Sequence, residues 1–276
     1  MKSLSLASIL VALLALPSAW AAEKLAVADG VATEVIYLLG AEDRLAAVDT
    51  TSTYPAAAKE LPQIGYFRRL SAEGILSISP DLLIASPNAG PPVALDQVRS
   101  AGIEIAVMPD VGTLDDIAPK IEAVGAALSL DAKAAEIAEQ VRAEIADLRA
   151  TKPETDTPPR VMFVLTVRDG TPLVVGQKTP ADEVIREAGA VNAADFDRYK
   201  PMSREAVIAA APDLILMTAE HGEALADPNT LLERPEFALT PAGKNKRLLR
   251  LPALTVLGLG PRTPGSIRTL REALFP

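Results

Sequence analysis

Two pairs of matching stretches run through this chain, and they limit the folds that it can adopt. Residues 71–83, SAEGILSISPDLL, match residues 203–215, SREAVIAAAPDLI, so that a serine, a glutamate and a Pro-Asp pair fall at equivalent places. A second pair, EVIYLLGA from Glu34 and EVIREAGA from Glu183, occurs in the same order but at a different spacing. Two matches in the same order indicate two lobes of one ancestral fold, with a segment of altered length between the pairs. A cleft between such lobes is a common place for a ligand.

The middle of the chain predicts one long helix. Residues 131–152 contain neither glycine nor proline and are rich in Ala, Glu, Arg and Leu, which favour helices. Asp131 is a suitable N-cap, and apolar residues recur near one face. At 1.5 Å per residue this helix would be about 33 Å long. We expect it to connect the lobes stiffly, before a proline-rich break over residues 153–159.

On either side of this segment, short apolar runs alternate with helical stretches. In the first half we expect strands at 25–28, 45–48, 82–85 and 103–108, and helices at 31–39, 71–78 and 93–101. In the second half we expect strands at 161–165, 173–175 and 214–217, and helices at 181–188 and 266–274. The alternation is typical of an α/β fold in which mainly parallel sheets are flanked by helices. The predicted organisation is an N-terminal lobe over 22–130, the connecting helix over 131–152 and a C-terminal lobe over 153–276.

The first 21 residues predict export by a signal peptide. Lys2 supplies a positive charge, residues 4–16 are almost wholly apolar, and Ala19-Trp20-Ala21 presents small residues where a signal peptidase cuts. The apolar run is too short to span a bilayer, so we expect cleavage after Ala21. The chain has no cysteine, so we expect neither a disulfide nor a lipid anchor. An unanchored exported protein is retained by a cell with two membranes, which favours the periplasm.

Charge and residue content exclude several classes of function. With 27 Lys+Arg against 36 Asp+Glu and no basic run, the chain is a poor candidate for binding nucleic acid or an anionic membrane. It has one histidine and no nucleophile elbow, phosphate loop or His-Glu-x-x-His helix, so no enzyme is indicated. A zinc or manganese carrier would be expected to gather several histidines with carboxylates. An extracytoplasmic adhesion or scaffold module would not need two lobes around a cleft.

A tyrosine-arginine motif carries the resemblance to a known family. Residues 65–74 read GYFRRLSAEG and are followed by Ser79-Pro80-Asp81-Leu82. The supporting stretches are AGPP at 89–92, YKP at 199–201, LTPAGK at 239–244 and GLGPRTP at 258–264. The chain resembles the binding proteins whose lobes are joined by one rigid helix and which serve importers of siderophores, vitamin B12 and haem. It is most similar to the haem-binding branch, over essentially all of the chain after residue 21.

The resemblance implies that Tyr66 binds the haem iron. Ferric iron is a hard cation, which an anionic phenolate oxygen suits, as tyrosine does in some haem enzymes. A free phenol titrates near 10, so the iron and a nearby cation must favour the phenolate. Arg68 lies two residues further on and in an extended segment would project to the same side as Tyr66. It could then donate to the phenolate oxygen, which is how the family uses this arginine, whereas Arg69 is expected to be a surface charge.

Four other residues are weighed for the cleft. Tyr199 precedes the C-terminal copy of the repeated helix and could form a pocket wall opposite Tyr66. Arg168 follows a predicted strand and could pair with a haem propionate, because a guanidinium binds a carboxylate bidentately. His221, the only histidine, follows another predicted strand and is conceivable as a second axial ligand, although a solvated loop histidine is commoner. A role for Tyr54 at the cleft rim stays open.

Glu73 and Glu205 occupy equivalent places in the repeat, each two residues after a serine that resembles an N-cap. A carboxylate in the first turn of a helix is favoured by the helix dipole, which accounts for both without a function. In the family, acidic residues at these positions contact arginines of the permease, and the two roles are compatible.

The expected function is therefore that of a monomeric binding protein, not an enzyme, which delivers haem to an inner-membrane ABC importer. Haem could reach it free or from an outer-membrane receptor. The alternative is the same fold with a ferric siderophore or corrinoid as ligand. The tyrosine-arginine motif distinguishes the two, because those ligands need not be held through a tyrosine–iron bond.

Overall fold

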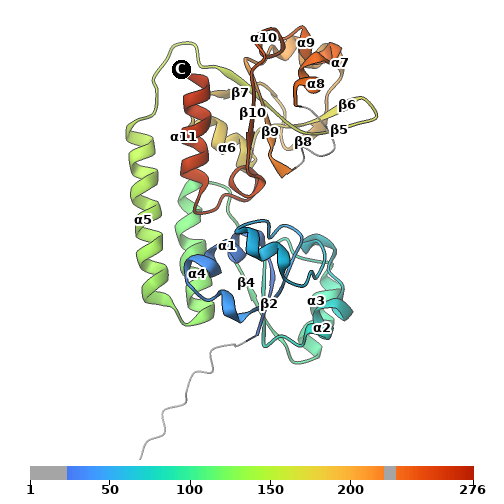
Figure 1. Cartoon of the computed structure of the whole chain (residues 1–276), viewed down its shortest axis with the longest axis vertical. Helices are drawn as coiled ribbons and strands as arrows, with labels where there is room; N and C mark the ends of the chain where they lie inside the picture. Colours follow the sequence, from blue (N-terminus) through green and yellow to red (C-terminus); the bar gives the residue numbers. More distant parts are fainter. Residues whose placement is uncertain (1–23, 221–227) are drawn as a thin grey trace, which may run out of the picture.

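The computed structural model describes residues 24–220 and 228–276, so the expected signal peptide and His221 lie outside the described residues. Figure 1 shows two α/β lobes stacked along the long axis of the molecule, with the helices α4 (Ile117–Leu128) and α5 (Asp131–Ala150) running along one side. The expected two-lobed α/β fold is confirmed. Across the described residues, no helix combines the length and apolar character needed to cross a membrane.

The N-terminal lobe is built on a four-stranded parallel sheet in the order β2-β1-β3-β4. Its strands are β1 (Leu25–Ala28), β2 (Leu45–Val48), β3 (Leu82–Ala85) and β4 (Glu104–Val107). The flanking helices are α1 (Gly30–Leu38), α2 (Ala72–Ile78) and α3 (Pro92–Ser100). Alternate residues of β1 enter two different cores, with Leu25 and Val27 in one and Ala26 and Ala28 in the other. Burial on both faces explains why β1, β2 and β3 are continuous apolar runs.

The sheet of the C-terminal lobe is mixed, in the order β10-β9-β5-β6-β8 with β7 beside β5. Its strands are β5 (Arg160–Arg168), β6 (Thr171–Val175), β7 (Val191–Asn192), β8 (Tyr199–Pro201), β9 (Leu214–Thr218) and β10 (Leu248–Leu251). The pairs β5–β6 and β6–β8 are antiparallel. The first of them is a hairpin, in which β5 turns directly into β6 through Asp169 and Gly170, both with positive φ. An Asp-Gly pair favours such a hairpin turn. The helices are α6 (Pro180–Glu187), α7 (Arg204–Ala210), α8 (Pro228–Glu233), α9 (Pro235–Ala238), α10 (Pro241–Lys244) and α11 (Thr263–Leu274).

The long helix α5 is present, but it does not stand alone. It begins at Asp131, which lies in its first turn and is not its N-cap. The preceding helix α4, which the sequence did not predict, packs along it, and a Cβ added at Gly125 would lie 2.1 Å from the Cβ of Ala134. One hydrophobic cluster contains residues of both helices and of both sheets. The connection is therefore part of a shared core, which resists rotation of one lobe against the other.

The two repeated stretches fold in the same way. The side chain of Ser71 caps α2 by accepting from the Gly74 amide at 3.4 Å, and that of Ser203 caps α7 by accepting from the Ala206 amide at 3.2 Å. Each helix ends at a residue with positive φ. An aspartate then follows in each lobe, and its Oδ2 accepts a backbone N–H from the start of a neighbouring strand. The donor to Asp81 is Lys24, just before β1, at 2.9 Å, and the donor to Asp213 is Arg160, the first residue of β5, at 2.8 Å. The duplication is thus visible in local structure as well as in sequence.

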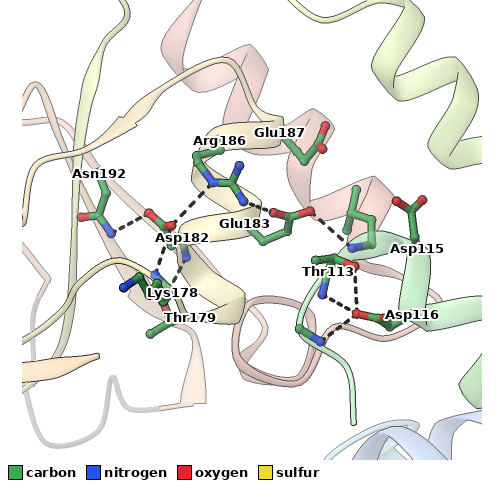
Figure 2. Close-up of polar contacts among 12 residues, drawn as sticks. Thr113, Asp115, Asp116, Lys178, Thr179, Asp182, Glu183, Arg186, Glu187 and Asn192 are labelled. Carbon is green, nitrogen blue, oxygen red and sulfur yellow. Dashed lines mark hydrogen bonds and ion pairs between the residues drawn. The ribbon is translucent and has the colours of Figure 1, made fainter. Parts of the chain in front are cut away.

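The glutamates of the second repeated pair both reach out of their own helix at the junction of the lobes. Glu34 of α1 pairs with Arg262 of the C-terminal lobe, with 2.9 Å between Nη2 and Oε2. Figure 2 shows Glu183 of α6 pointing toward the turn of Thr113 and Asp116, which leads into α4. The Glu183 carboxylate accepts the Leu114 amide at 3.5 Å and pairs with Arg186. The equivalent residues Glu34 and Glu183 therefore each bind a segment of the opposite lobe.

Candidate functional site

The edge of the N-terminal sheet at which its strands end faces the C-terminal lobe. Gly30, the first residue of α1, lies two residues after β1, and a Cβ added there would lie 2.8 Å from Leu254 Cδ2 of the short helical turn η6 (Leu254–Gly258). Ligands of parallel sheets gather at this edge. The loops that follow β2, β3 and β4 emerge there, and the first of them carries Tyr66.

Tyr66 sits immediately before a 3-10 turn, η3 (Phe67–Arg69), and 39% of its surface is exposed. Gly65 before it has φ +91°, a conformation that favours glycine. The loop is held by backbone hydrogen bonds on both sides: the Thr50 amide donates to the Gly65 carbonyl at 3.0 Å, and the Gly90 amide donates to the Phe67 carbonyl at 2.9 Å. Tyr66 is thus an accessible phenol on a well-anchored turn.

Arg68 does not take the position that an extended segment would give it. The chain turns directly after Tyr66, and the Arg68 guanidinium lies over the Phe67 ring, 5.1 Å from its centroid. The Phe67 ring in turn meets the Tyr66 ring edge to face, with 4.7 Å between centroids. Among the described residues, Arg68 makes no hydrogen bond to the Tyr66 oxygen. The expected alignment through an extended backbone is therefore wrong, and both side chains instead contact the Phe67 ring.

Tyr199 lies opposite this turn, on the C-terminal lobe. It is the first residue of β8 and 43% exposed. Burial raises the pKa of its phenol, the positive charge of Arg68 lowers it, the Tyr66 phenol raises it, and Arg198 lowers it. Charge effects of this kind fall off with distance, so Tyr66 and Arg68 of one lobe lie within electrostatic range of Tyr199 on the other, which Arg198 precedes in the chain. The structure thus brings three of the predicted residues together and adds Arg198, which no motif signalled.

Exposed apolar side chains also lie at or after the strand ends of the N-terminal sheet. They include Tyr54 after β2, Val93 at the start of α3 and Val107 at the end of β4, which are 42%, 61% and 51% exposed. In the described residues, no group of three or more His, Asp and Glu side chains could hold a metal ion. The arrangement instead offers phenol oxygens, guanidinium groups and apolar walls. A large, mainly apolar and anionic ligand that carries its own hard metal ion would match all three.

The remaining predicted residues lie elsewhere. Arg168 is the exposed last residue of β5 beside the hairpin turn, and no described contact joins it to the phenols. Glu73 and Glu205 are exposed in the first turns of α2 and α7. The pKa of the Glu205 carboxyl is lowered because its own backbone N–H and the Ser203 hydroxyl donate to it. His221 lies outside the described residues.

Comparison with known proteins places the chain among extracytoplasmic binding proteins. The family model for periplasmic binding proteins matches residues 25–254. The chain is similar to the solved periplasmic haem-binding protein RhuT from Roseiflexus sp. RS-1, with 40% identity, a TM-score of 0.87, and coverage of 92% of this chain and 98% of that one. It is also similar to the haem-binding protein BhuT in complex with two haems, with 41% identity, a TM-score of 0.84, and coverage of 91% and 97%. Among curated proteins it is 34% identical to a vitamin B12-binding protein of Vibrio cholerae over 192 residues, which are 69% of this chain and 68% of that one.

Proposed function

Because the chain belongs to the periplasmic binding protein family, we propose that it captures haem in the cleft between its lobes and delivers it to an inner-membrane ABC importer. The single observation that carries this proposal is the Tyr66 phenol on an anchored turn, with Arg68 beside it and Tyr199 and Arg198 opposite. Relatives that are named for haem cover nearly the whole chain at about 40% identity, which supports the same ligand.

In this proposal Tyr66 is the axial ligand of the haem iron. An exposed phenol oxygen can reach a metal that arrives with the ligand, and as a phenolate it is the hard anionic donor that ferric iron prefers. Arg68 stabilises the negative charge of the phenolate by swinging from the Phe67 ring to the oxygen or by acting at short range. Tyr199 forms the opposite wall, and the apolar side chains cover the porphyrin faces.

The charges of the cleft favour haem over a corrinoid. The chain as a whole carries a net charge of −9, yet Arg68, Arg198 and Lys200 all belong to the two segments that carry the facing phenols. Haem brings two propionates, which guanidinium and ammonium groups bind well. Arg168 is a more distant candidate for a propionate, and His221 remains a candidate second axial ligand.

The protein would act outside the cytoplasm as a monomer without catalytic activity, unanchored by lipid. Glu73 and Glu205 lie on equivalent helices, one in each lobe, and would contact the two halves of the permease. Haem would arrive free or from an outer-membrane receptor.

The test is a titration of the purified protein with hemin and, separately, with cyanocobalamin. We expect a stoichiometric spectral change with hemin, including the charge-transfer band of tyrosine-ligated ferric haem, and none with cobalamin. Tyr66→Phe keeps the ring and removes only the oxygen, so the band should vanish, whereas Tyr199→Phe should keep it. A wild-type protein that binds cobalamin and not hemin would establish the corrinoid alternative.

A further inference from the structure

Phe67 is the point at which the Tyr66 turn is held. Its ring contacts the Tyr66 ring and lies under the Arg68 guanidinium, so both functional side chains rest on it. Its carbonyl accepts the Gly90 amide at 2.9 Å. Its own amide donates to a carboxylate oxygen, Asp49 Oδ2, at 3.3 Å. The position of the Phe67 backbone therefore limits the directions in which the Tyr66 and Arg68 side chains can point.

Asp49 directly follows β2 and is completely buried, with 0% of its surface exposed. Besides the Phe67 amide, its oxygens accept from the Thr51 amide at 3.2 Å, from the Thr51 hydroxyl at 2.8 Å and from the Ser52 hydroxyl at 3.2 Å. The Thr51 hydroxyl also accepts from the Gly30 amide at 3.1 Å, and the Ser52 hydroxyl bonds that of Thr33 at 2.8 Å. One carboxylate thus joins the start of α1 to the Tyr66 turn.

Asp49 is a buried carboxylate with no cationic partner among the described residues, and the fold alone does not explain why a charged residue stands at this position. Asp29, the residue after the neighbouring strand β1, is buried beside a cation, with Lys120 Nζ 2.6 Å from its Oδ2. In the part of the chain that the structure describes, Asp49 receives only neutral donors. Burying a carboxylate without a cation is costly, and burial accordingly raises the pKa of Asp49 to about 6. A neutral side chain would cap the same loop at less cost.

We propose that Asp49 is a positioning residue for ligand binding, which fixes the Phe67 amide and thereby sets the orientation of the Tyr66 phenol and of Arg68. The inference rests on the proposed function, because it assigns Asp49 to the geometry of the same iron ligand. A carboxylate is a stronger acceptor than a neutral oxygen, which accounts for a charged group at a place where several neutral donors meet.

The experiment compares Asp49→Ala, Asp49→Asn and Thr51→Val with wild type. Thr51→Val is the matched control, because it removes a hydroxyl from the same network and leaves the Phe67 bond in place. We expect Asp49→Ala to release haem at least about tenfold faster than wild type and to alter the ferric charge-transfer band, since a hydrogen bond to a charged group is lost. The rate of haem release from Asp49→Asn should lie between those of wild type and Asp49→Ala, because the amide oxygen of the new side chain can still accept from the Phe67 amide. Thr51→Val should keep the wild-type spectrum and release rate.

Two readouts separate this inference from the proposed function and from a loss of stability. Amide hydrogen exchange of residues 66–68 in the protein without haem should speed up in the Asp49 variants and not in Thr51→Val, whatever the ligand is. Wild-type protein that gives no haem spectrum would refute the proposed function, and unchanged exchange at residues 66–68 would overturn the role of Asp49. If Asp49→Ala does not fold, the comparison is made with Asp49→Asn. The proposal is overturned if Asp49→Asn releases haem no faster than Thr51→Val does, measured under conditions in which the two variants are equally stable.

Discussion

Arg262 of the C-terminal lobe and Glu34 of the N-terminal lobe form a two-point ion pair, with Nε 3.0 Å from Oε1 and Nη2 2.9 Å from Oε2. Glu34 is 1% exposed, so its charge has left water. The same guanidinium lies 3.5 Å from the centroid of the Tyr54 ring, also on the N-terminal lobe. One arginine of the C-terminal Gly-Leu-Gly-Pro-Arg stretch therefore holds two residues of the other lobe.

Removing Arg262 should destabilise the protein because it leaves the buried Glu34 carboxylate unpaired. We expect Arg262→Ala to lower the free energy of unfolding by about 2–4 kcal/mol, somewhat less than the roughly 3–5 kcal/mol for breaking a fully buried pair, because the Arg262 side chain is 30% exposed. Urea unfolding measures the change. Arg268→Ala, which removes exposed pairs to Glu144 and Asp147, should cost at most about 1 kcal/mol. Adding Glu34→Gln to Arg262→Ala should recover part of the loss, and a loss no larger than that of Arg268→Ala would contradict the argument.

Arg68→Ala should weaken the hold on ferric haem without disturbing the fold. The loss of a positive charge near the phenolate makes the iron–oxygen bond easier to break by acid or by reduction, since ferrous iron is softer and binds phenolate less well. A pH titration of the haem spectrum and the reduction midpoint report both effects. Arg69→Ala, a change of equal charge one residue away, is the control. Identical behaviour of the two variants would make Arg68 a surface charge.

Asp49 should make the protein less stable as the pH rises from about 4 to about 6. Its pKa is raised from the ordinary value of 3.8 to about 6 in the folded state, so within this window the native protein binds a proton that the unfolded chain releases. The free energy of unfolding then falls with pH, by up to about 3 kcal/mol for a shift of this size. Asp49→Asn cannot titrate, so the stability of wild type minus that of the variant should decrease across the window. A difference that is constant with pH would show that Asp49 titrates normally.

The packed pair α4 and α5 should limit movement between the lobes. Because a single hydrophobic cluster includes both helices and both sheets, rotation would open packed surface, and we expect free and haem-loaded protein to differ by only a few degrees. Small-angle scattering profiles with and without hemin test this. A marked contraction on loading would indicate a flexible hinge in place of a rigid connection.

Charge reversal at Glu73 and Glu205 together should cripple transport while haem affinity stays close to wild type. Both side chains are exposed on equivalent helices of the two lobes, and paired rim charges guide encounter and register in a salt-dependent way. Haem uptake into vesicles that carry the partner transporter is the measurement. Glu136→Lys with Glu139→Lys on α5 changes the net charge equally and should transport normally. Normal transport by the Glu73→Lys, Glu205→Lys protein would show that the two glutamates only stabilise the first turns of their helices and do not contact the permease.

Much of the architecture could be predicted from local pattern. Strands β1, β2 and β3 have the expected bounds, and α5 ends within two residues of its predicted end, because apolar runs and helix-breaking residues act over short distances. The duplicated Ser-x-Glu stretches form the expected capped helices for the same reason. The hairpin β5–β6 and the helix α4 were missed, although Asp169-Gly170 is a hairpin signal and α4 is an apolar, alanine-rich segment.

The sequence by itself determined that the chain has two related lobes, a long helix between them and a tyrosine-arginine motif before the first repeated helix. Only the tertiary structure decided which residues meet Tyr66 and what holds the lobes together. Arg68 turns onto Phe67 because the backbone forms a 3-10 turn there, Asp49 reaches the Phe67 amide from another loop, and Arg262 finds Glu34 across 228 positions of sequence. Local periodicity sets helices and strands, whereas such contacts depend on how sheets and helices pack, which no short stretch of sequence encodes.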